Sequence, residues 1–297
     1  FFSSRFLPTT SAWRMNMAIQ EIQAKSVLQK SGIPGAAYVI NPYVGCVHGC
    51  VYCYAKFMRR FTGHADAWGA FLDVKQNAPA LLRQQLRRRK TPVQGTIFLS
   101  SVTDPYLPAE RKYALTRGIL ETLLEHQTAI SILTKSDLAL RDIDILRQFR
   151  KCSVGVSLMT ADDAVARQFE PQAAPPSRRI QALRELREAG IRTYAFISPY
   201  IPAVSNFDQM FALTSPVIDE FGIEALNVRC GRAGVAQTLR AAAPEKLDDC
   251  ARELRDGAYW DELDRHARAC AAEAHLDFMG LFRHSRSPRP YAAGDEK

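Results

Sequence analysis

Short apolar runs rich in β-branched residues alternate along this chain with longer segments in which apolar residues recur at helical spacing. The short runs lie at 36–40, 95–101, 129–134, 152–158, 191–198 and 223–229. The longer segments predict helices over 110–126, 138–149, 177–190 and 208–221. Strands that alternate with helices in this way build parallel sheets joined by right-handed crossovers. We therefore expect an α/β fold, either a partial (β/α)6 TIM-type barrel or an open doubly wound sheet.

The alternation stops after Arg229, and this change predicts the domain organisation. Residues 244–276 have the pattern of one or two polar helices, and a basic tail that contains proline follows. We expect an N-terminal extension over 1–35, a partial-barrel core over 36–230, and a C-terminal helical extension with a basic tail over 231–297. A length of 297 residues suits one barrel-sized unit with such extensions.

Composition argues against two broad classes of protein. Hydrophobic residues make up 47% and charged residues 24% of the chain, which is typical of a globular protein and not of a disordered one. No apolar run approaches the roughly 18 residues needed to cross a bilayer. Arg5, Pro8 and Arg14 interrupt the stretch that a secretory signal would keep apolar. We expect a cytoplasmic protein with no membrane partner.

An excess of basic residues favours a polyanionic partner, such as DNA or another phosphate-bearing substrate. The chain has 39 Lys and Arg against 31 Asp and Glu, a net charge of +8. The excess is concentrated in three clusters, which are Lys56, Arg59 and Arg60, then Arg83 with Arg87–Lys90, and finally Arg283, Arg286 and Arg289. The alternative for each cluster is a solvated basic face without a ligand.

Three of the seven cysteines lie close together directly after the first predicted strand. Cys46, Cys50 and Cys53 form the pattern C-x3-C-x2-C within NPYVGCVHGCVYCYAKF. Three thiolates at this spacing can bind three irons of a [4Fe-4S] cluster and leave the fourth iron open to a small molecule. The alternative is a zinc site, which needs a fourth ligand and has His48 and His64 as neighbours. A zinc-stabilised nucleic-acid-binding protein without catalysis is therefore the second hypothesis.

Several motifs accompany this loop in a fixed order over about residues 38–230. They are INPYVGC, HGCVYCYA, SSVTDPYLPAE, LTKSDLALRD, GVSLMT, FEPQAAPPSRRIQAL and SPYIP. Together with Tyr52 before the last cysteine, they resemble the radical S-adenosylmethionine (SAM) superfamily. Within that superfamily the sequence is most similar to spore photoproduct lyase and its relatives, often called DNA repair photolyases.

The resemblance implies a partial (β/α)6 barrel with a [4Fe-4S] cluster and SAM as cofactors. In this family reduction of the cluster cleaves SAM into methionine and a 5'-deoxyadenosyl radical, which abstracts hydrogen from a substrate. The substrate implied is a DNA lesion, and a non-DNA substrate such as a nucleotide, RNA or peptide is the alternative. An electron donor such as flavodoxin or ferredoxin would supply the reduction.

Candidate SAM-binding residues follow successive strands, where ligands of parallel barrels bind. Thr103 and Asp104 follow the second strand and suit the ammonium group of SAM, although Asp104 could instead form an Asx turn before Pro105. Lys135 follows the third strand and Ser157 ends the fourth, and both match cofactor-site positions in the lyase relatives. The alternatives are a solvated lysine and a buried, hydrogen-bonded hydroxyl.

Candidate catalytic residues come from the resemblance. Tyr52 is expected along the adenine of SAM, and Tyr54 matches a lyase tyrosine that takes part in hydrogen transfer. The lyase's cysteine hydrogen donor has Ser101 at its position here, so Cys230 at the end of the sixth predicted strand is the candidate replacement. Cys230 could instead be a small buried residue. In the FEPQAAPPSRR segment, Glu170 is expected to form a structural salt bridge with the arginines.

Overall fold

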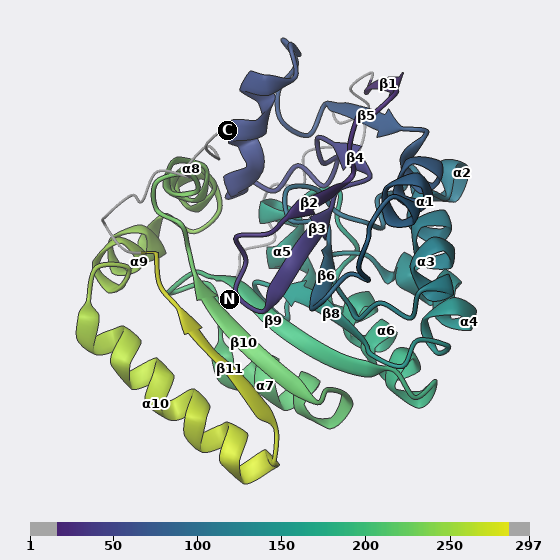
Figure 1. Cartoon of the computed structure of the whole chain (residues 1–297). Helices are drawn as coiled ribbons and strands as arrows, with labels where there is room; N and C mark the ends of the chain where they lie inside the picture. The colour runs from purple at the N-terminus through teal and green to yellow at the C-terminus, as the bar shows by residue number, and fades with distance from the viewer. Residues whose placement is uncertain (1–16, 285–297) are drawn as a thin grey trace.

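An eight-stranded sheet forms the centre of the molecule in the computed structural model, which describes residues 17–284 (Figure 1). Six of its strands are consecutive neighbours that pair in parallel: β3 (Ala36–Ile40), β6 (Thr96–Leu99), β7 (Ile130–Thr134), β8 (Cys152–Leu158), β9 (Arg192–Tyr200) and β10 (Glu220–Ala225). Antiparallel β2 (Leu28–Lys30) flanks β3, and parallel β11 (Asp277–Phe282) flanks β10. The order β11-β10-β9-β8-β7-β6-β3-β2 confirms the six predicted parallel strands as one curved α/β sheet.

Helices surround the outside of this sheet (Figure 1). The α-helices are α1 (Ala78–Arg87), α2 (Glu110–Tyr113), α3 (Leu115–Glu125), α4 (Ile143–Leu146), α5 (Asp163–Phe169), α6 (Pro176–Glu188), α7 (Phe207–Thr214), α8 (Arg232–Ala242), α9 (Leu247–Glu253) and α10 (Gly257–Ala274). The 3-10 helices are η1 (Tyr54–Phe61), η2 (Asp137–Asp142), η3 (Ser215–Val217) and η4 (Pro244–Lys246).

Side chains alternate between the two faces of the sheet, because successive residues of a strand point to opposite sides. The outward residues form the core beneath the helices; among them are Ile97, Leu99, Ile132, Val154, Ile197, Phe221 and Ile223. Small or polar residues occupy the opposite phase, as Ser157, Ser198, Gly222 and Glu224 do. The inner face of the curved sheet therefore combines small and polar side chains with the rings of Tyr194 and Phe196, which lie over Gly155 and Gly222.

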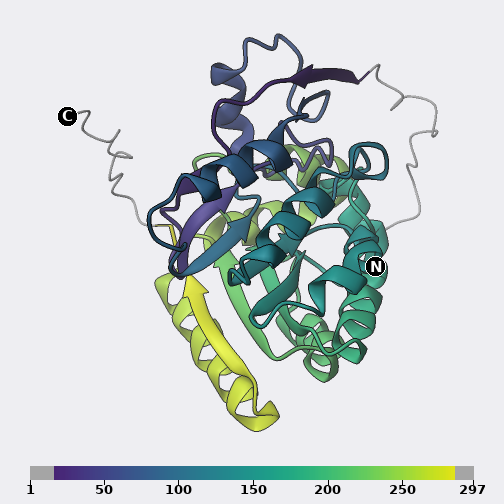
Figure 2. The same cartoon turned by 45° about the vertical axis from the view of Figure 1, so that its right-hand side comes forward.

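A second sheet, which the sequence did not predict, positions the cysteine loop. Strand β5 (Phe71–Lys75) lies between β1 (Ala18–Ile22) and the two-residue strand β4 (Tyr43–Val44). Because β4 ends at Val44, directly before the loop, the pairing of β4 with β5 anchors the start of the loop. This small sheet lies at the top of the molecule in Figures 1 and 2.

Three predicted helices differ from the observed ones. The helix over 110–126 breaks at Ala114, which has a φ of 48°, because the Glu110 carboxylate accepts a hydrogen bond from the Thr116 amide and caps α3. The helix over 138–149 is the 3-10 turn η2 followed by the single turn α4. The helix over 208–221 ends at Thr214, where Pro216 lacks an amide donor, and β10 begins six residues later.

The prediction that strands stop at Arg229 is wrong, because β11 adds a parallel strand beside β10. Helix α10 lies alongside β11 in both views and buries Trp260 and Leu263 against the sheet (Figures 1 and 2). The C-terminal helices are therefore part of the same packed unit. The domain boundaries themselves stay a prediction, and residues 1–16 and 285–297, including Arg286 and Arg289, lie outside the described residues.

Candidate functional site

Glycines shape the cysteine loop at the carboxyl end of the sheet. Gly45 has a φ of 88°, and a Cβ there would lie 2.6 Å from the carbonyl oxygen of Phe71. A Cβ on Gly69 would lie 2.9 Å from the Cα of Gly49. Only glycine fits such contacts, so the loop can fold tightly against β5 and the segment before it.

The three cysteine thiols of the loop are largely shielded from water. Cys46 and Cys50 are buried and Cys53 is half-buried. Burial, reinforced by the Cys50 thiol, raises the pKa of Cys46 well above its usual value. Burial also raises the pKa of Cys50 to about 12. Thiolates are therefore disfavoured here without a cationic partner, and bound metal would supply one.

The sulfur arrangement suits a cluster better than a single zinc ion. Tetrahedral zinc with Zn–S bonds of about 2.3 Å holds its sulfurs about 3.8 Å apart. Within residues 17–284, the trio whose ligand atoms all lie within 4.8 Å of one another is Asp208, His266 and Cys270, and not the loop cysteines. The loop sulfurs are therefore spread too widely for one ion, whereas a four-iron cluster is a larger body.

The two histidines considered as zinc ligands have other partners. His48 is buried, and its Nδ1 lies 3.6 Å from Oδ2 of Asp104. His64 is hydrogen-bonded through Nε2 to Asp73 at 2.7 Å, and its ring stacks on Phe71. Neither histidine is placed as a fourth ligand for the three thiols.

A buried ion pair stabilises the cysteine loop through Tyr52. The Tyr52 hydroxyl donates to Glu170, which is 2% exposed and paired with Arg179, itself 1% exposed. Nη1 of Arg179 donates to the carbonyl oxygen of Ser157 at 2.7 Å. The predicted salt bridge is confirmed for Arg179, whereas Arg178 pairs with Asp137 on the surface. The network connects the loop, the start of α6 and the end of β8.

Asp104 forms the Asx turn that the sequence offered as its alternative role. Its Oδ1 accepts from the Tyr106 amide at 2.8 Å and from Oγ1 of Thr134 at 2.7 Å. Its Oδ2 accepts from the Lys135 amide at 2.8 Å. The Thr103 hydroxyl donates to the carbonyl oxygen of Gly45. Both residues therefore connect the cysteine loop to neighbouring strand ends, and their contact with SAM stays a prediction.

Lys135 and Ser157 meet at adjacent strand ends. Nζ of Lys135 donates to Oγ of Ser157 at 2.8 Å, and that hydroxyl donates to the carbonyl oxygen of Ser198 at 2.9 Å. Burial lowers the pKa of Lys135, but the Glu170 carboxylate and the Cys50 thiol outweigh it and hold that pKa above its usual value. Nζ also lies 5.7 Å from the centre of the Tyr52 ring. A permanent positive charge therefore lies beside the cysteine loop.

The catalytic candidates occupy different surroundings. Tyr54 is 45% exposed, and its hydroxyl donates to the carbonyl oxygen of Ser101. Cys230 is exposed and does not end a strand, because β10 ends at Ala225 and a turn follows. The next residue, Gly231, lies against the loop, since a Cβ there would be 2.8 Å from the carbonyl oxygen of Tyr52. Cys230 is thus beside the loop although the strand prediction for it was wrong.

Comparison with known proteins agrees with this arrangement. The radical SAM superfamily model matches residues 40–208. The chain belongs to the radical SAM superfamily. An uncharacterized protein of Methanocaldococcus jannaschii is 36% identical over 84% of this chain and 93% of its own length. A radical SAM Nalpha-GlyT isomerase of Pseudomonas phage M6 is 29% identical over 59% of this chain and 35% of its own length.

A solved spore photoproduct lyase with dinucleoside spore photoproduct shares the fold. Its TM-score is 0.63 at 16% identity, over 90% of this chain and 81% of the lyase. The fold is therefore that of a radical SAM enzyme, whose partial barrel uses a [4Fe-4S] cluster and SAM. The buried thiols and the spread of the sulfurs in this radical SAM enzyme fit such a cluster. Among residues 17–284, no helix has both the length and the apolar character needed to cross a membrane.

Sequence reasoning missed an acidic residue on the inner face of this radical SAM barrel. Oε2 of Glu224 accepts from the Ser198 hydroxyl at 2.6 Å, and Oε1 lies 3.4 Å from Nε2 of His284. Burial raises the pKa of Glu224, but hydrogen bonds from His284 and Ser198 outweigh it and lower that pKa overall. Glu224 lies on the face of β10 opposite to the buried Phe221 and Ile223, and this alternation is the sequence feature that could have indicated it.

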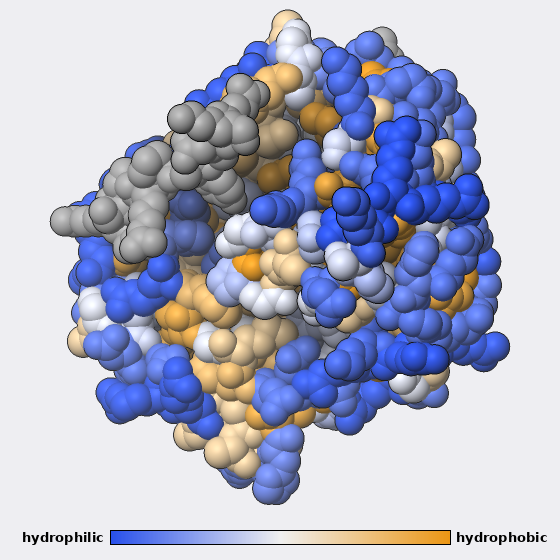
Figure 3. Space-filling view, viewed as in Figure 1, coloured by the Kyte–Doolittle hydropathy of each residue, from blue (hydrophilic) through white to orange (hydrophobic). Residues whose placement is uncertain are grey.

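An apolar wall lies next to Glu224. Met279 and Phe282 of β11 are 36% and 38% exposed, and Phe282 contacts Phe196 of β9 with ring centres 6.0 Å apart. Figure 3 shows hydrophobic surface where Figure 1 places β10 and β11. The inner face therefore offers aromatic surface beside a carboxylate, and both are available to a substrate.

Helix α8 can approach the cysteine loop only because it carries glycine. A Cβ on Gly234 would lie 2.1 Å from the carbonyl oxygen of Val51. We expect Gly234→Ala to lower the free energy of unfolding by about 1–3 kcal/mol, the usual cost of overpacking, and to lower the iron bound per chain. Urea unfolding and iron analysis after anaerobic reconstitution measure both effects.

The matched control is Gly257→Ala at the start of α10, where a Cβ would have no atom within 4 Å. Because alanine is the better helix former, this control should keep full stability and iron content. Equal iron content in the two variants would contradict a role of α8 in holding the loop.

Proposed function

We propose that this radical SAM enzyme abstracts hydrogen from a substrate that is either a DNA lesion or, as the alternative, a non-DNA molecule such as a nucleotide, RNA or peptide. The observation that carries the proposal is the set of three thiols, two buried and one half-buried, on a glycine-shaped loop beside the strand-end pair Lys135 and Ser157. The net charge of +8 supports a polyanionic substrate. The dinucleoside ligand of the spore photoproduct lyase structure supports nucleic-acid chemistry by relationship alone.

The residues of the loop would hold the cofactors as follows. Cys46, Cys50 and Cys53 bind three irons, and the bound cluster with SAM supplies reductive cleavage to methionine and a 5'-deoxyadenosyl radical. An electron donor such as flavodoxin or ferredoxin supplies the electron. The aromatic ring of Tyr52, held by Glu170, would lie along the adenine of bound SAM and exclude water from the cluster.

Strand-end side chains would orient SAM. Lys135 attracts its carboxylate, and the Ser157 hydroxyl contacts the ribose. An ionised carboxylate has about four acceptor positions, and the structure fills three of those of Asp104. The remaining acceptor position of the Asp104 carboxylate, together with the Thr103 hydroxyl oxygen, would accept hydrogen bonds from the ammonium group of SAM.

SAM cleavage is the first test of this proposal. Protein reconstituted anaerobically with iron and sulfide is given dithionite and SAM, and 5'-deoxyadenosine is measured by chromatography. We expect it to form, and a fully loaded cluster that releases none would overturn the proposal.

The hydrogen donor distinguishes a DNA-lesion substrate from the non-DNA alternative. Ser101 stands where the lyase has a thiol, and an O–H bond is too strong to replace one, which favours the alternative. If a lesion is repaired and Cys230 returns the hydrogen, Cys230→Ala should still release 5'-deoxyadenosine but convert dinucleoside spore photoproduct to misrouted products. Cys270→Ala on α10 is the control and should behave as wild type. Wild-type protein that cleaves SAM and leaves the photoproduct intact, with no effect of Cys230→Ala, would exclude spore photoproduct as the substrate and favour the non-DNA alternative.

A further inference from the structure

The indole of Trp68, in the segment between η1 and β5, carries a buried hydrogen-bond donor. Its Nε1 is shielded from water, and no oxygen or nitrogen of residues 17–284 accepts a hydrogen bond from it. The hydroxyl oxygens of Ser100 and Tyr106 share this condition, but a hydroxyl proton can rotate toward another acceptor. The indole N–H has a fixed direction in the plane of its ring. Buried donors are nearly always paired in folded proteins, so this one indicates an acceptor that is weak in the protein alone.

The group beside this donor is the thiol of Cys53. Burial raises the pKa of Cys53. The Ala55 amide and the Trp68 side chain oppose that rise, because each directs a donor at the sulfur. A neutral thiol is a weak acceptor and does not satisfy the indole N–H. A thiolate carries the negative charge that turns the same contact into a strong hydrogen bond.

Packing holds the indole in this place. The Trp68 ring packs against the apolar cluster that includes Cys46, and it meets the Phe71 ring edge to face with ring centres 5.9 Å apart. The next residue, Gly69, touches the cysteine loop, since a Cβ there would lie 2.9 Å from the Cα of Gly49. The donor is therefore already ordered beside the loop, and little entropy is lost when the sulfur becomes charged.

A donor directed at a cluster sulfur has a consequence for electron transfer. Hydrogen bonds to the sulfurs are among the features that set the reduction potential of an iron–sulfur cluster. Reduction adds one electron, which flavodoxin, ferredoxin or dithionite supplies, and the added negative charge spreads onto the cysteine sulfurs. The indole N–H therefore stabilises the reduced form more than the oxidised form. The indole keeps its proton, so no proton is taken up with the electron.

We propose that the Trp68 indole donates its N–H to the Cys53 thiolate and raises the reduction potential of the bound [4Fe-4S] cluster. Trp68 acts through Cys53 and is a positioning residue rather than a ligand. This inference deepens the proposed function and rests on it for Cys53 as an iron ligand. Because the reduced cluster is the form that cleaves SAM, the indole favours the electron transfer that precedes cleavage.

The test compares two substitutions of tryptophan by phenylalanine in anaerobically reconstituted protein. Trp68→Phe keeps an aromatic ring and removes the N–H. Trp260→Phe is the matched control, because Trp260 is buried in the core beneath α10 and not at the cysteine loop. The reduced cluster is measured by electron paramagnetic resonance during a redox titration, and iron and sulfide are measured per chain.

Trp68→Phe should shift the titration to lower potential. A hydrogen bond to a charged acceptor changes an equilibrium about tenfold or more. At a fixed potential the ratio of reduced to oxidised cluster should therefore fall about tenfold, a shift of about 59 mV for a one-electron couple. Trp260→Phe should titrate as wild type. If Trp68 served packing alone, Trp68→Phe would lower the iron content and leave the potential of the loaded protein unchanged, and that result would overturn the proposal.

An isotope label tests the contact itself, also where Trp68→Phe holds no cluster. Wild-type protein is produced with tryptophan that carries nitrogen-15 in the indole, and the reduced cluster is examined by pulsed electron paramagnetic resonance. We expect a nitrogen-15 coupling that Trp260→Phe keeps and Trp68→Phe loses. Wild-type protein without the coupling would overturn the proposal. A loaded wild-type cluster that releases no 5'-deoxyadenosine from SAM would overturn the proposed function, while the potentials and the coupling still decide the role of Trp68.

Discussion

Cys50→Ala protein is expected to bind no [4Fe-4S] cluster and to release no 5'-deoxyadenosine from SAM. Each of the three loop cysteines supplies one thiolate, and no neighbouring side chain can take its place. His48 faces Asp104, and both oxygens of Asp104 already accept hydrogen bonds. Iron content, the visible thiolate-to-iron absorption and product chromatography should all fall to background. The same result is expected for Cys46→Ala and Cys53→Ala.

Cys270→Ala is the control for this prediction. Cys270 is half-buried on α10, outside the cysteine loop, so its removal should leave iron content and SAM cleavage unchanged. Full iron content and turnover in Cys50→Ala would show that the cluster is bound elsewhere.

Glu170→Gln is expected to lower the free energy of unfolding by about 3–5 kcal/mol, because it leaves the Arg179 charge buried without its counterion. Both side chains of this pair are almost fully buried, so solvent does not screen the loss. The Tyr52 hydroxyl also loses its charged acceptor beside Cys53. Urea unfolding of anaerobically reconstituted protein, followed by circular dichroism, measures the change.

Asp137→Asn is the matched control, since it breaks the neighbouring pair with Arg178, which is largely exposed. Exposed pairs are worth about 0–1 kcal/mol, so this variant should unfold close to wild type. If the two substitutions lowered the free energy of unfolding equally, the buried pair would contribute no more to stability than the pair at the surface.

The contribution of Glu170 should also depend on pH in a defined direction. Burial raises the pKa of this carboxyl, but the charges of Arg179 and Lys135 outweigh burial and lower that pKa overall. A carboxylate with a lowered folded-state pKa stabilises the protein fully above its unfolded value, near 4.3. That stability is lost as the pH falls through the folded value. The difference in unfolding free energy between wild type and Glu170→Gln should therefore shrink below about pH 4.

The features predicted well from the sequence are those that short segments specify. The spacing of Cys46, Cys50 and Cys53 and the strands at 152–158 and 191–198 depend on residues within one element, and the structure has them close to the predicted positions. The errors lie where distant contacts compete with local pattern. The segment DFMGLF forms β11 because β10 and α10 cover it, although the sequence analysis placed it before a basic tail.

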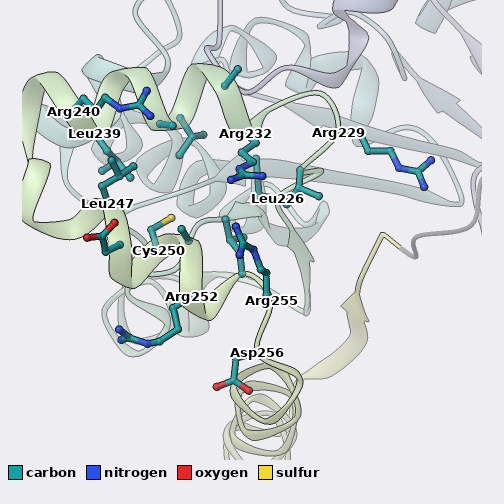
Figure 4. A pocket seen from close by; sticks show the side chains of 17 residues that line it. Leu226, Arg229, Arg232, Leu239, Arg240, Leu247, Cys250, Arg252, Arg255 and Asp256 are labelled. Atoms are coloured by element: carbon teal, nitrogen blue, oxygen red, sulfur yellow. The ribbon is translucent and has the colours of Figure 1, made fainter.

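The alternation of strands and helices, the three-thiol loop and the strand-end positions of Lys135 and Ser157 can be predicted from the sequence, because hydrophobic period and residue spacing are local properties. The partners of these groups depend on the packing of segments that are distant in the chain. Tyr52 and Glu170 are 118 residues apart, and Asp104 and Lys135 are 31 apart. A cavity of about 1110 Å³ between α8 and α9 likewise exists only where these two helices pack together (Figure 4). Such contacts depend on how whole elements pack, and no local pattern in the chain encodes them.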